Sequence, residues 1–423
     1  MKLAASPSPV RSEVHSASVP RDASVTAANR SGLLTRLFRR GLLRRLHGIE
    51  GGRITLVDGP VEESAGCEDS ACLSATITVH DRRFYRRVAL GGELGAAESY
   101  LDGEWECDDL TALFRVLARN LRPSVSATGT FWSRLAARFG HWLARNTQRG
   151  SRRNIEAHYD LGDDFFSLFL DPTMMYSSAI FEREEMSLEQ AQLARLDRIC
   201  RALELRPSDH VVEIGTGWGG FALHAARNYG CRVTTTTISQ NQFETATRRV
   251  QQAGLQDRVT VLDRDYRDLC GTFDKLVSIE MIEAVGHRYF DTFFQQCGRL
   301  LNRHGRMLLQ AIVMPENRYD QYLRSVDFIQ KYIFPGGCLP SITAMQQSVA
   351  RQTDLWLVQL EDFARHYART VREWRGRFRD NLDRIRQLGY SDRFHRMWDY
   401  YLCYCEAAFE ERVVGVVHAV WER

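Results

Sequence analysis

The sequence has no run of about 18 apolar residues, the length that a membrane-spanning helix requires, so we expect no transmembrane segment. Lysine is nearly missing: it occurs only at Lys2, Lys275 and Lys331, and arginine supplies almost all of the positive charge. The formal net charge of the 423 residues is only +3, which argues against a protein that binds nucleic acid through bulk charge. With 44% apolar and 26% charged residues, the composition is that of a globular protein of two or three domains.

Paired cysteine motifs are also missing. The ten cysteines include no CxxC pair, so the sequence predicts neither a zinc or other metal site nor a disulfide framework. We therefore expect reduced thiols in a cytosolic protein. Residues 1–30 lack the apolar core of a signal peptide and are rich in Ser, Ala and Val, which favours a disordered tail.

Two segments combine regularly spaced apolar side chains with arginine and contain no acidic residue. The first is 31–47, SGLLTRLFRRGLLRRLH, and the second lies within 121–155, where Trp and Phe stand beside Arg. Basic amphipathic helices of this kind bind anionic membrane surfaces. Alternatively, the first helix only covers the core of a small α+β domain at 31–120, and 121–155 is a linker. A nucleic-acid patch would use the same residue types, but nothing else in the chain supports one.

From residue 190 onward, short apolar segments alternate with amphipathic ones. We expect strands over 210–215, 231–239, 258–266, 273–281 and 305–314, and helices over 191–205, 221–230, 240–254 and 288–301. This alternation predicts an α/β fold with a parallel sheet and helices on both faces. Two further strands are expected at 355–363 and 412–421, with helices between them.

A glycine-rich turn follows the first of these strands. Residues 211–222 are VVEIGTGWGGFA, in which Glu213 precedes the turn glycines Gly215 and Gly217. Doubly wound sheets bind ligands at the carboxyl end of this strand, and glycine lets the backbone approach a ligand closely. The spacing differs from the dinucleotide motif GxGxxG, and no P-loop lysine is present. The E-x-G-x-G pattern is typical of S-adenosylmethionine (SAM) binding in class I methyltransferases; the alternative is an ordinary tight turn.

Six further motifs occur in a characteristic order. They are AHYDLGDDFFSLFLDPTMMYSSAIF (157–181), TTISQNQ (236–242), DRDYRDL (263–269), SIEMIEAVG (278–286), YIFPGGCLPS (332–341) and YYLCYCEAAF (400–409). On these residues the sequence resembles the cyclopropane fatty acid synthase family over about 154–423, and more weakly over 78–110.

The resemblance implies a class I methyltransferase fold at 156–423. Its sheet would have seven strands, mostly parallel, with the antiparallel one at 412–421. Helical additions at 316–350 and 363–409 would build the acyl pocket. A small α+β N-terminal domain would occupy 31–120, between a disordered tail at 1–30 and a basic linker at 121–155.

The resemblance also implies a reaction. The methyl group of SAM adds to the cis double bond of a phospholipid acyl chain, a carbocation forms, and loss of a proton from the added methyl closes a cyclopropane ring. Aromatic faces at Tyr176, Phe181 and Tyr401 could stabilise the cation, or these rings could simply fill the core. The implied SAM residues are Tyr176, Ser177, Glu213, Gly215, Gly217, Thr237, Gln242, Asp265, Tyr266 and Arg267.

In this family the proton acceptor is a bicarbonate ion held by Glu, His, Tyr and backbone amides. Glu283 and Tyr367 match that Glu and Tyr, and Cys405 matches a cysteine near the C-terminus. Ser178 stands where the family has Cys and Gln310 where it has His; Gln310 can still donate an N–H and Ser178 a backbone N–H. Alternatively, Glu283 caps a helix and Tyr367 fills the core.

The partners implied are unsaturated phospholipids at an anionic membrane surface, with no nucleic acid. The expected location is cytoplasmic and peripheral to the inner face of the membrane, and a homodimer is left open. Three alternatives remain: a methyltransferase giving methylene- or methyl-branched acyl chains, a catalytically silent lipid- or SAM-binding protein, and a soluble small-molecule methyltransferase.

Overall fold

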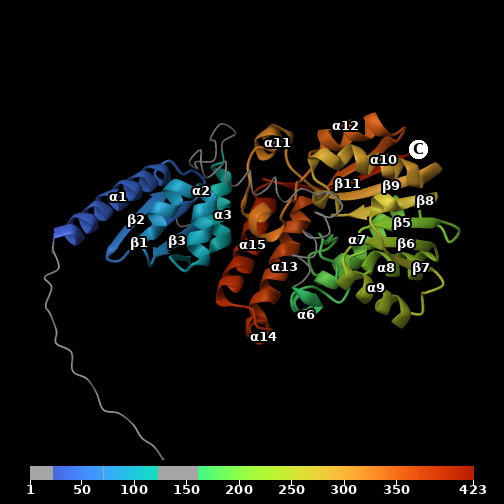
Figure 1. Cartoon of the computed structure of the whole chain (residues 1–423), viewed down its shortest axis with the longest axis horizontal. Coiled ribbons are helices and arrows are strands. Elements are labelled where there is room, and N and C mark those ends of the chain that lie inside the picture. The colour runs from blue at the N-terminus through green and yellow to red at the C-terminus, as the bar shows by residue number, and fades with distance from the viewer. Residues whose placement is uncertain (1–21, 70, 122–160) are drawn as a thin grey trace, which may run out of the picture.

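The computed structural model describes residues 22–69, 71–121 and 161–423, with side chains from residue 32 onward (Figure 1). The basic segment expected at 121–155 therefore lies almost entirely outside the described residues. Among the described ranges, none of the helices combines the length and the apolarity needed to cross a bilayer.

The N-terminal unit is a four-stranded sheet covered by helices. Its strand order is β2-β1-β3-β4, with β1 and β3 parallel and the two outer pairs antiparallel. The elements are α1 (Asp22–Leu46), β1 (Arg53–Asp58), β2 (Val61–Gly66), β3 (Ser74–Val79), α2 (Arg83–Leu101), β4 (Trp105–Cys107) and α3 (Leu110–Arg119). The helix expected at 31–47 is confirmed, but it begins at Asp22, so 22–30 is helical where we expected a disordered tail.

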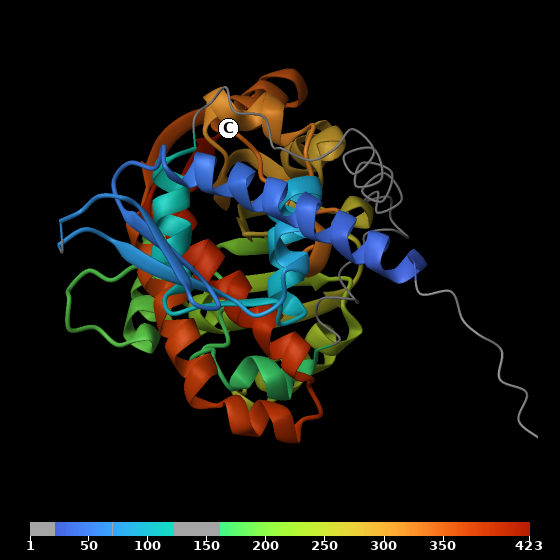
Figure 2. The same cartoon turned by 90° about the vertical axis from the view of Figure 1, so that its left-hand side faces the viewer.

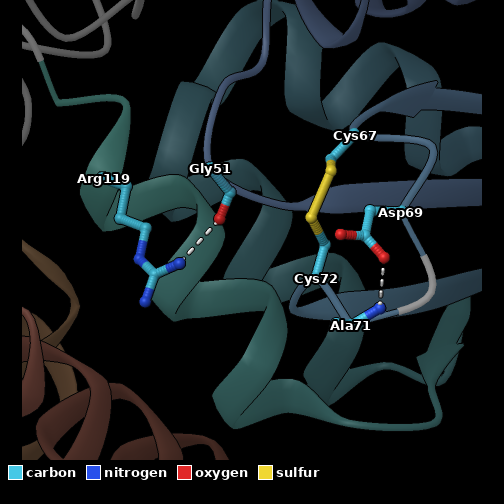
Figure 3. Close-up of a disulfide and its surroundings, with 6 residues drawn as sticks. All are labelled: Gly51, Cys67, Asp69, Ala71, Cys72 and Arg119. Atoms are coloured by element: carbon cyan, nitrogen blue, oxygen red, sulfur yellow. Dashed lines mark hydrogen bonds between the residues drawn. A yellow bond between two sulfur atoms is a disulfide. The ribbon is translucent and has the colours of Figure 1, made fainter.

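The expectation that every thiol is reduced is wrong for one pair. Cys67 and Cys72, in the loop between β2 and β3, form a disulfide (Figure 3). The Asp69 carboxylate accepts a hydrogen bond from the Ala71 N–H at 3.0 Å, which tightens the loop, and the two cysteine Cα atoms lie 6.5 Å apart, within disulfide range. The other eight cysteines are free. A five-residue separation carries no motif, so the sequence did not indicate this pair.

The large domain contains the predicted seven-stranded sheet. Its strand order is β10-β11-β9-β8-β5-β6-β7, in which β11 alone runs antiparallel to its neighbours. The strands are β5 (His210–Ile214), β6 (Arg232–Thr237), β7 (Val259–Asp263), β8 (Phe273–Ile279), β9 (Leu301–Val313), β10 (Trp356–Asp362) and β11 (Gly415–Glu422). The C-terminal strand is thus the expected antiparallel one.

Helices cover both faces of this sheet. Successive residues point to opposite sides, so that Val211 packs in the core beneath α7 and α8 while Val212 packs beneath α10 and α12. The helices are α6 (Gly162–Ser167), α7 (Leu188–Ala202), α8 (Gly220–Tyr229), α9 (Gln240–Gln252), α10 (Phe290–Leu300), α11 (Glu316–Tyr322), α12 (Ile342–Gln352), α13 (Ala364–Asp380), α14 (Leu382–Gln387) and α15 (Asp392–Glu410). Short helical turns are η1 (Tyr266–Asp268), η2 (Ile282–Ala284), η3 (His287–Tyr289) and η4 (Ile329–Ile333).

Helices α13 and α15 stand between the large sheet and the N-terminal unit (Figure 1). Figure 2 shows α1 running across the outside of the N-terminal unit, with α13 and α15 behind it. Ion pairs fix this junction: Arg115 and Arg119 on α3 both bind the Glu411 carboxylate, at 2.8 and 2.9 Å. Arg396 on α15 donates to the Tyr100 carbonyl at 2.6 Å. The two domains therefore share one packed interface.

Candidate active site

One cavity of about 1710 Å³ runs from the carboxyl edge of the large sheet to the N-terminal unit. At the sheet it is lined by the glycine turn and by the segments after β6, β7 and β8. Helices α13 and α15 form its middle, and at the far end its apolar lining includes Leu42, Leu46, Ile54, Phe84 and Leu113. The cavity therefore has a polar end in one domain and an apolar end in the other.

The glycine turn presents bare backbone to the cavity. Gly215 and Gly217 have φ angles of 99° and 51°, which L side chains rarely adopt. Gly217 lines the cavity, and a Cβ atom there would have no neighbour within 4 Å. Before the turn, burial raises the pKa of the Glu213 carboxyl to about 8. The turn thus leaves room for a ligand to touch the main chain.

The remaining residues expected to bind SAM line the same end. The Thr237 hydroxyl donates to the Gln242 side chain at 2.9 Å, which ties the end of β6 to the start of α9. Asp265 accepts from the Arg267 guanidinium at 2.6 and 2.8 Å, and Tyr266 packs edge-on against Phe293. All of these except Phe293 line the cavity. The segment after β7 is therefore held in shape by its own ion pair.

Two tyrosines meet over the cavity. The Tyr176 and Tyr401 hydroxyls are hydrogen-bonded at 2.8 Å, and the Tyr176 ring packs 5.2 Å from the Trp374 ring. The neighbouring Ser177 carbonyl accepts from the Gln192 side chain at 2.8 Å. Phe181, by contrast, is not among the cavity residues and packs under the Arg369 guanidinium. Tyr176 and Tyr401 are thus the aromatic residues of the expected set that face the cavity.

A buried hydrogen-bond network centres on Glu280, a residue that the sequence analysis did not single out. Its Oε1 accepts from the Ser178 backbone N–H at 2.9 Å and from Gln310 Nε2 at 2.6 Å. Its Oε2 accepts from the Tyr367 hydroxyl at 2.6 Å. Ser178 and Gln310 do not themselves line the cavity, whereas Glu280 and Tyr367 do. Three of the expected anion-holding groups therefore converge on one carboxylate of the chain.

His418 fixes the orientation of Gln310. The two residues are cross-strand partners on β11 and β9, and His418 Nε2 lies 2.9 Å from Gln310 Oε1. Burial lowers the pKa of the His418 ring to about 3, so the ring is neutral. Because the Gln310 amide donates to Glu280, its oxygen must accept from the His418 N–H. His418 is thus a positioning residue for the network.

Glu283 lies three residues after Glu280 and has different partners. Its Oε1 accepts from the Ile312 N–H at 2.6 Å, and its Oε2 is buried and has no hydrogen-bond partner among the described residues. Burial and the neighbouring Glu280 charge raise the pKa of the Glu283 carboxyl to about 8. The Glu283 carboxyl therefore keeps its proton at neutral pH.

The expected residue Cys405 and two histidines occupy supporting places. Cys405 on α15 lines the cavity, and burial raises the pKa of its thiol, so the thiol is neutral. His366 Nδ1 accepts from the Phe181 N–H at 3.2 Å, and His287 Nδ1 lies 2.8 Å from the Tyr319 hydroxyl. Both histidines thus shape loops outside the network.

The pKa of Glu283 leads to a prediction about stability. Folding raises the pKa of this carboxyl from 4.5 to about 8. Between these pH values the folded chain therefore keeps a proton that the unfolded chain has released. In this window each rise in pH lowers the free energy of unfolding. We expect Glu283→Gln to raise the melting temperature more at pH 8.5 than at pH 5.5, as measured by circular dichroism. An equal change at both pH values would contradict this assignment.

Comparisons with known proteins agree with this geometry. The chain matches the family described as "Mycolic acid cyclopropane synthetase" over residues 146–419. It is 38% identical over 338 residues to the tuberculostearic acid methyltransferase UfaA1 of Mycobacterium tuberculosis. The aligned part covers 78% of this chain and 79% of that protein. It is 36% identical over 368 residues to the cyclopropane-fatty-acyl-phospholipid synthase of Escherichia coli strain K12, and the aligned part covers 85% of this chain and 91% of that protein.

Solved structures show the same fold. The cyclopropane synthase MmaA2 from Mycobacterium tuberculosis superposes with a TM-score of 0.61 at 30% identity, over 64% of this chain and 98% of that one. The mycolic acid cyclopropane synthase CmaA1, complexed with SAH and CTAB, superposes with a TM-score of 0.60 at 32% identity, with the same coverage.

Proposed function

The chain belongs to the mycolic acid cyclopropane synthetase family and is a SAM-dependent methyltransferase, and on this basis we propose that it acts on a membrane phospholipid. The reaction transfers the methyl carbon of SAM to the cis double bond of an unsaturated acyl chain and closes a cyclopropane ring. The observation that supports it best is the single cavity, which joins a SAM-type glycine turn to an apolar channel reaching the N-terminal unit.

The residues present at the sheet edge fit SAM. The open space over Gly217 is a cradle that a Cβ atom would enter, and Asp265, Tyr266 and Arg267 stand beside it for the adenosine part. Tyr176 and Ser177 line the same cavity. Bound SAM supplies an electrophilic methyl group on a sulfonium.

The chain's own residues would hold the alkene and protect the cation. Tyr176 and Tyr401 offer aromatic faces that attract positive charge, and the hydrogen bond between their hydroxyls holds the two rings together. Burial raises the pKa of the Cys405 thiol and keeps it neutral, so the nucleophilic thiolate form is not present beside the cation. The apolar lining toward the N-terminal unit suits an acyl chain and excludes water.

The bicarbonate ion implied by the resemblance does not fit the described residues. The donors expected to hold it, from Tyr367, Gln310 and the Ser178 backbone, all donate to the Glu280 carboxylate instead. We therefore derive no step through bicarbonate.

We extend the proposal to peripheral docking on an anionic membrane. Helix α1 exposes Leu33, Leu34 and Leu37, with exposed fractions of 63%, 53% and 55%, beside the exposed Arg36 and Arg40. Its other side packs on the domain, and Leu42 and Leu46 line the cavity. The same helix would thus contact lipid and border the acyl channel. The homodimer and the cytoplasmic location stay predictions.

Replacing Leu33, Leu34 and Leu37 together by Ser should weaken binding to anionic phospholipid vesicles by about tenfold or more, since three apolar side chains would no longer enter the membrane. Co-sedimentation measures this. Leu388→Ser, at a residue 45% exposed on the large domain, is the matched control and should bind normally. Binding of the triple variant at the wild-type level, or binding that does not fall with salt, would contradict docking through α1.

A second product is supported by one comparison, because the relative at 38% identity is named a tuberculostearic acid methyltransferase. The chain could therefore form a methylene- or methyl-branched acyl chain from the same cation. Expression in a host without cyclopropane lipids tests both products. Upfield cyclopropyl protons in the extracted lipid would support the ring, and methylene or methyl-branch signals the alternative. Unchanged lipids would contradict both and favour a silent binding protein or a small-molecule methyltransferase.

A further inference from the structure

Resting on the proposed function, we propose that the Glu280 carboxylate is the proton acceptor that closes the ring. The base would then be part of the chain, in the place where the resemblance implies an exogenous anion. Glu280 would be a catalytic residue.

The geometry of the three donors carries this inference. The Ser178 N–H, the Gln310 amide and the Tyr367 hydroxyl come from three distant segments, and all three point at one carboxylate within 2.6–2.9 Å. These are the groups expected to hold an external anion, so that position is already filled. A carboxylate has about four acceptor sites, and three are used, which leaves one on Oε2 for a proton.

The backbone brings this carboxylate to the reacting end of the cavity. Glu280 follows β8 directly and has a φ of 49°, a left-handed conformation that costs a non-glycine residue free energy. The next residue, Met281, packs against the glycine turn, because a Cβ on Gly215 would lie 3.2 Å from its side chain. The strained residue therefore stands between the SAM-type turn and the donor network.

The surrounding charges keep one negative charge at this place. Burial raises the pKa of the Glu280 carboxyl, but its three hydrogen bonds and the Arg195 charge oppose that rise. Arg195 is fully buried and donates to Gln192 at 2.7 Å. Two adjacent carboxyls do not both ionise readily, and Glu283 is the one that keeps its proton. All three hydrogen-bond partners of Glu280 donate to it, which favours the carboxylate form, so we assign the negative charge of the pair to Glu280.

The step balances in atoms and electrons. Methyl transfer makes one C–C bond from the alkene π pair, while the S–C pair leaves with sulfur. The C–H pair of the added methyl then forms the second C–C bond of the ring, and its proton passes to Glu280 Oε2. The resulting carboxylic acid returns the proton to water after product release.

The test uses two variants of different kinds. Glu280→Gln keeps the shape but removes the base, and should lower turnover by about a hundredfold or more while changing SAM affinity less than about threefold. Glu280→Gly is compatible with the observed φ and removes the carboxylate. The three groups that donate to Glu280 then become free to bind an added anion. Glu204→Gly, at an exposed residue with a φ of 53° away from the cavity, controls for the backbone change.

Bicarbonate binding gives a readout that does not depend on turnover. With ¹³C-labelled bicarbonate, NMR should detect binding to Glu280→Gly but not to the wild type or to Glu204→Gly, and wild-type turnover should be the same in bicarbonate-free buffer. Equal bicarbonate binding by wild type and Glu280→Gly, or near-normal turnover by Glu280→Gln, would overturn the assignment. A wild type that alkylates no lipid would contradict the proposed function instead, and the binding comparison would still decide whether Glu280 fills the anion position.

Discussion

Gly217→Val is expected to abolish SAM binding while leaving the fold intact, with affinity falling by about a thousandfold. Gly217 lines the cavity and a Cβ there would meet no atom within 4 Å, so the added side chain has room in the folded protein but would take up space in which we expect the ligand to meet the backbone. The φ of 51° adds about 1–2 kcal/mol of strain for a residue other than glycine. Calorimetric titration with SAM measures the loss.

The strain and the ligand clash can be separated. Gly254 has a φ of 65°, its Cβ would also meet nothing within 4 Å, and it lies outside the cavity. Gly254→Val should therefore lose similar stability and keep SAM affinity. Near-normal SAM affinity in Gly217→Val would show that the turn does not contact the cofactor.

Tyr367→Phe should lower turnover by about a hundredfold with little change in SAM affinity. The substitution removes a hydroxyl that donates to Glu280 at 2.6 Å, and losing one such donor at a reacting charge typically costs this much. The ring remains, stacked on Phe409 with centroids 4.2 Å apart, so packing is preserved. Steady-state turnover on unsaturated phospholipid vesicles, with SAM affinity measured in parallel, gives the result.

Tyr229→Phe is the matched control for this variant. Tyr229 also donates its hydroxyl to a carboxylate, that of Asp197 at 3.1 Å, but it lies outside the cavity. Its turnover should stay close to wild type. If Tyr367→Phe were equally active, the phenol would be core packing and not part of the proton-accepting network.

The sequence predicted the large sheet well because its signals are local. The apolar segments that became β5, β6 and β8 have the lengths of buried strands, and the helices between them have helical periodicity. The glycine turn was recognisable for the same reason, since Gly215 and Gly217 mark positions that need positive φ. These features depend on neighbours within about a dozen residues, which a single sequence displays.

The centre of the candidate site could not be predicted in the same way. The motif SIEMIEAVG holds two acids, and the resemblance directed attention to Glu283, whereas the donors converge on Glu280. Those donors belong to a loop, to β9 and to α13, and only the folded chain brings them together. An acid directly after a buried strand at the ligand edge of the sheet was the one available signal.

His418 and the Cys67–Cys72 pair were missed for a related reason. Within an apolar strand, His418 resembles a core residue, and only its register opposite Gln310 reveals its role. The two cysteines carry no motif, and the loop geometry that joins them depends on the positions of β2 and β3. Pairings across a sheet or a loop are properties of the fold.

The most direct test of the central claim uses SAM labelled with ¹³C in its methyl group, purified enzyme and vesicles of an unsaturated phospholipid. Carbon NMR edited by the number of attached protons distinguishes the products. The account predicts a labelled ring carbon that bears two protons at an upfield cyclopropyl shift, since one methyl proton is lost to the base. A labelled CH₃ branch or a labelled exocyclic =CH₂ would contradict ring closure, and no label in the lipid would contradict acyl-chain methylation itself.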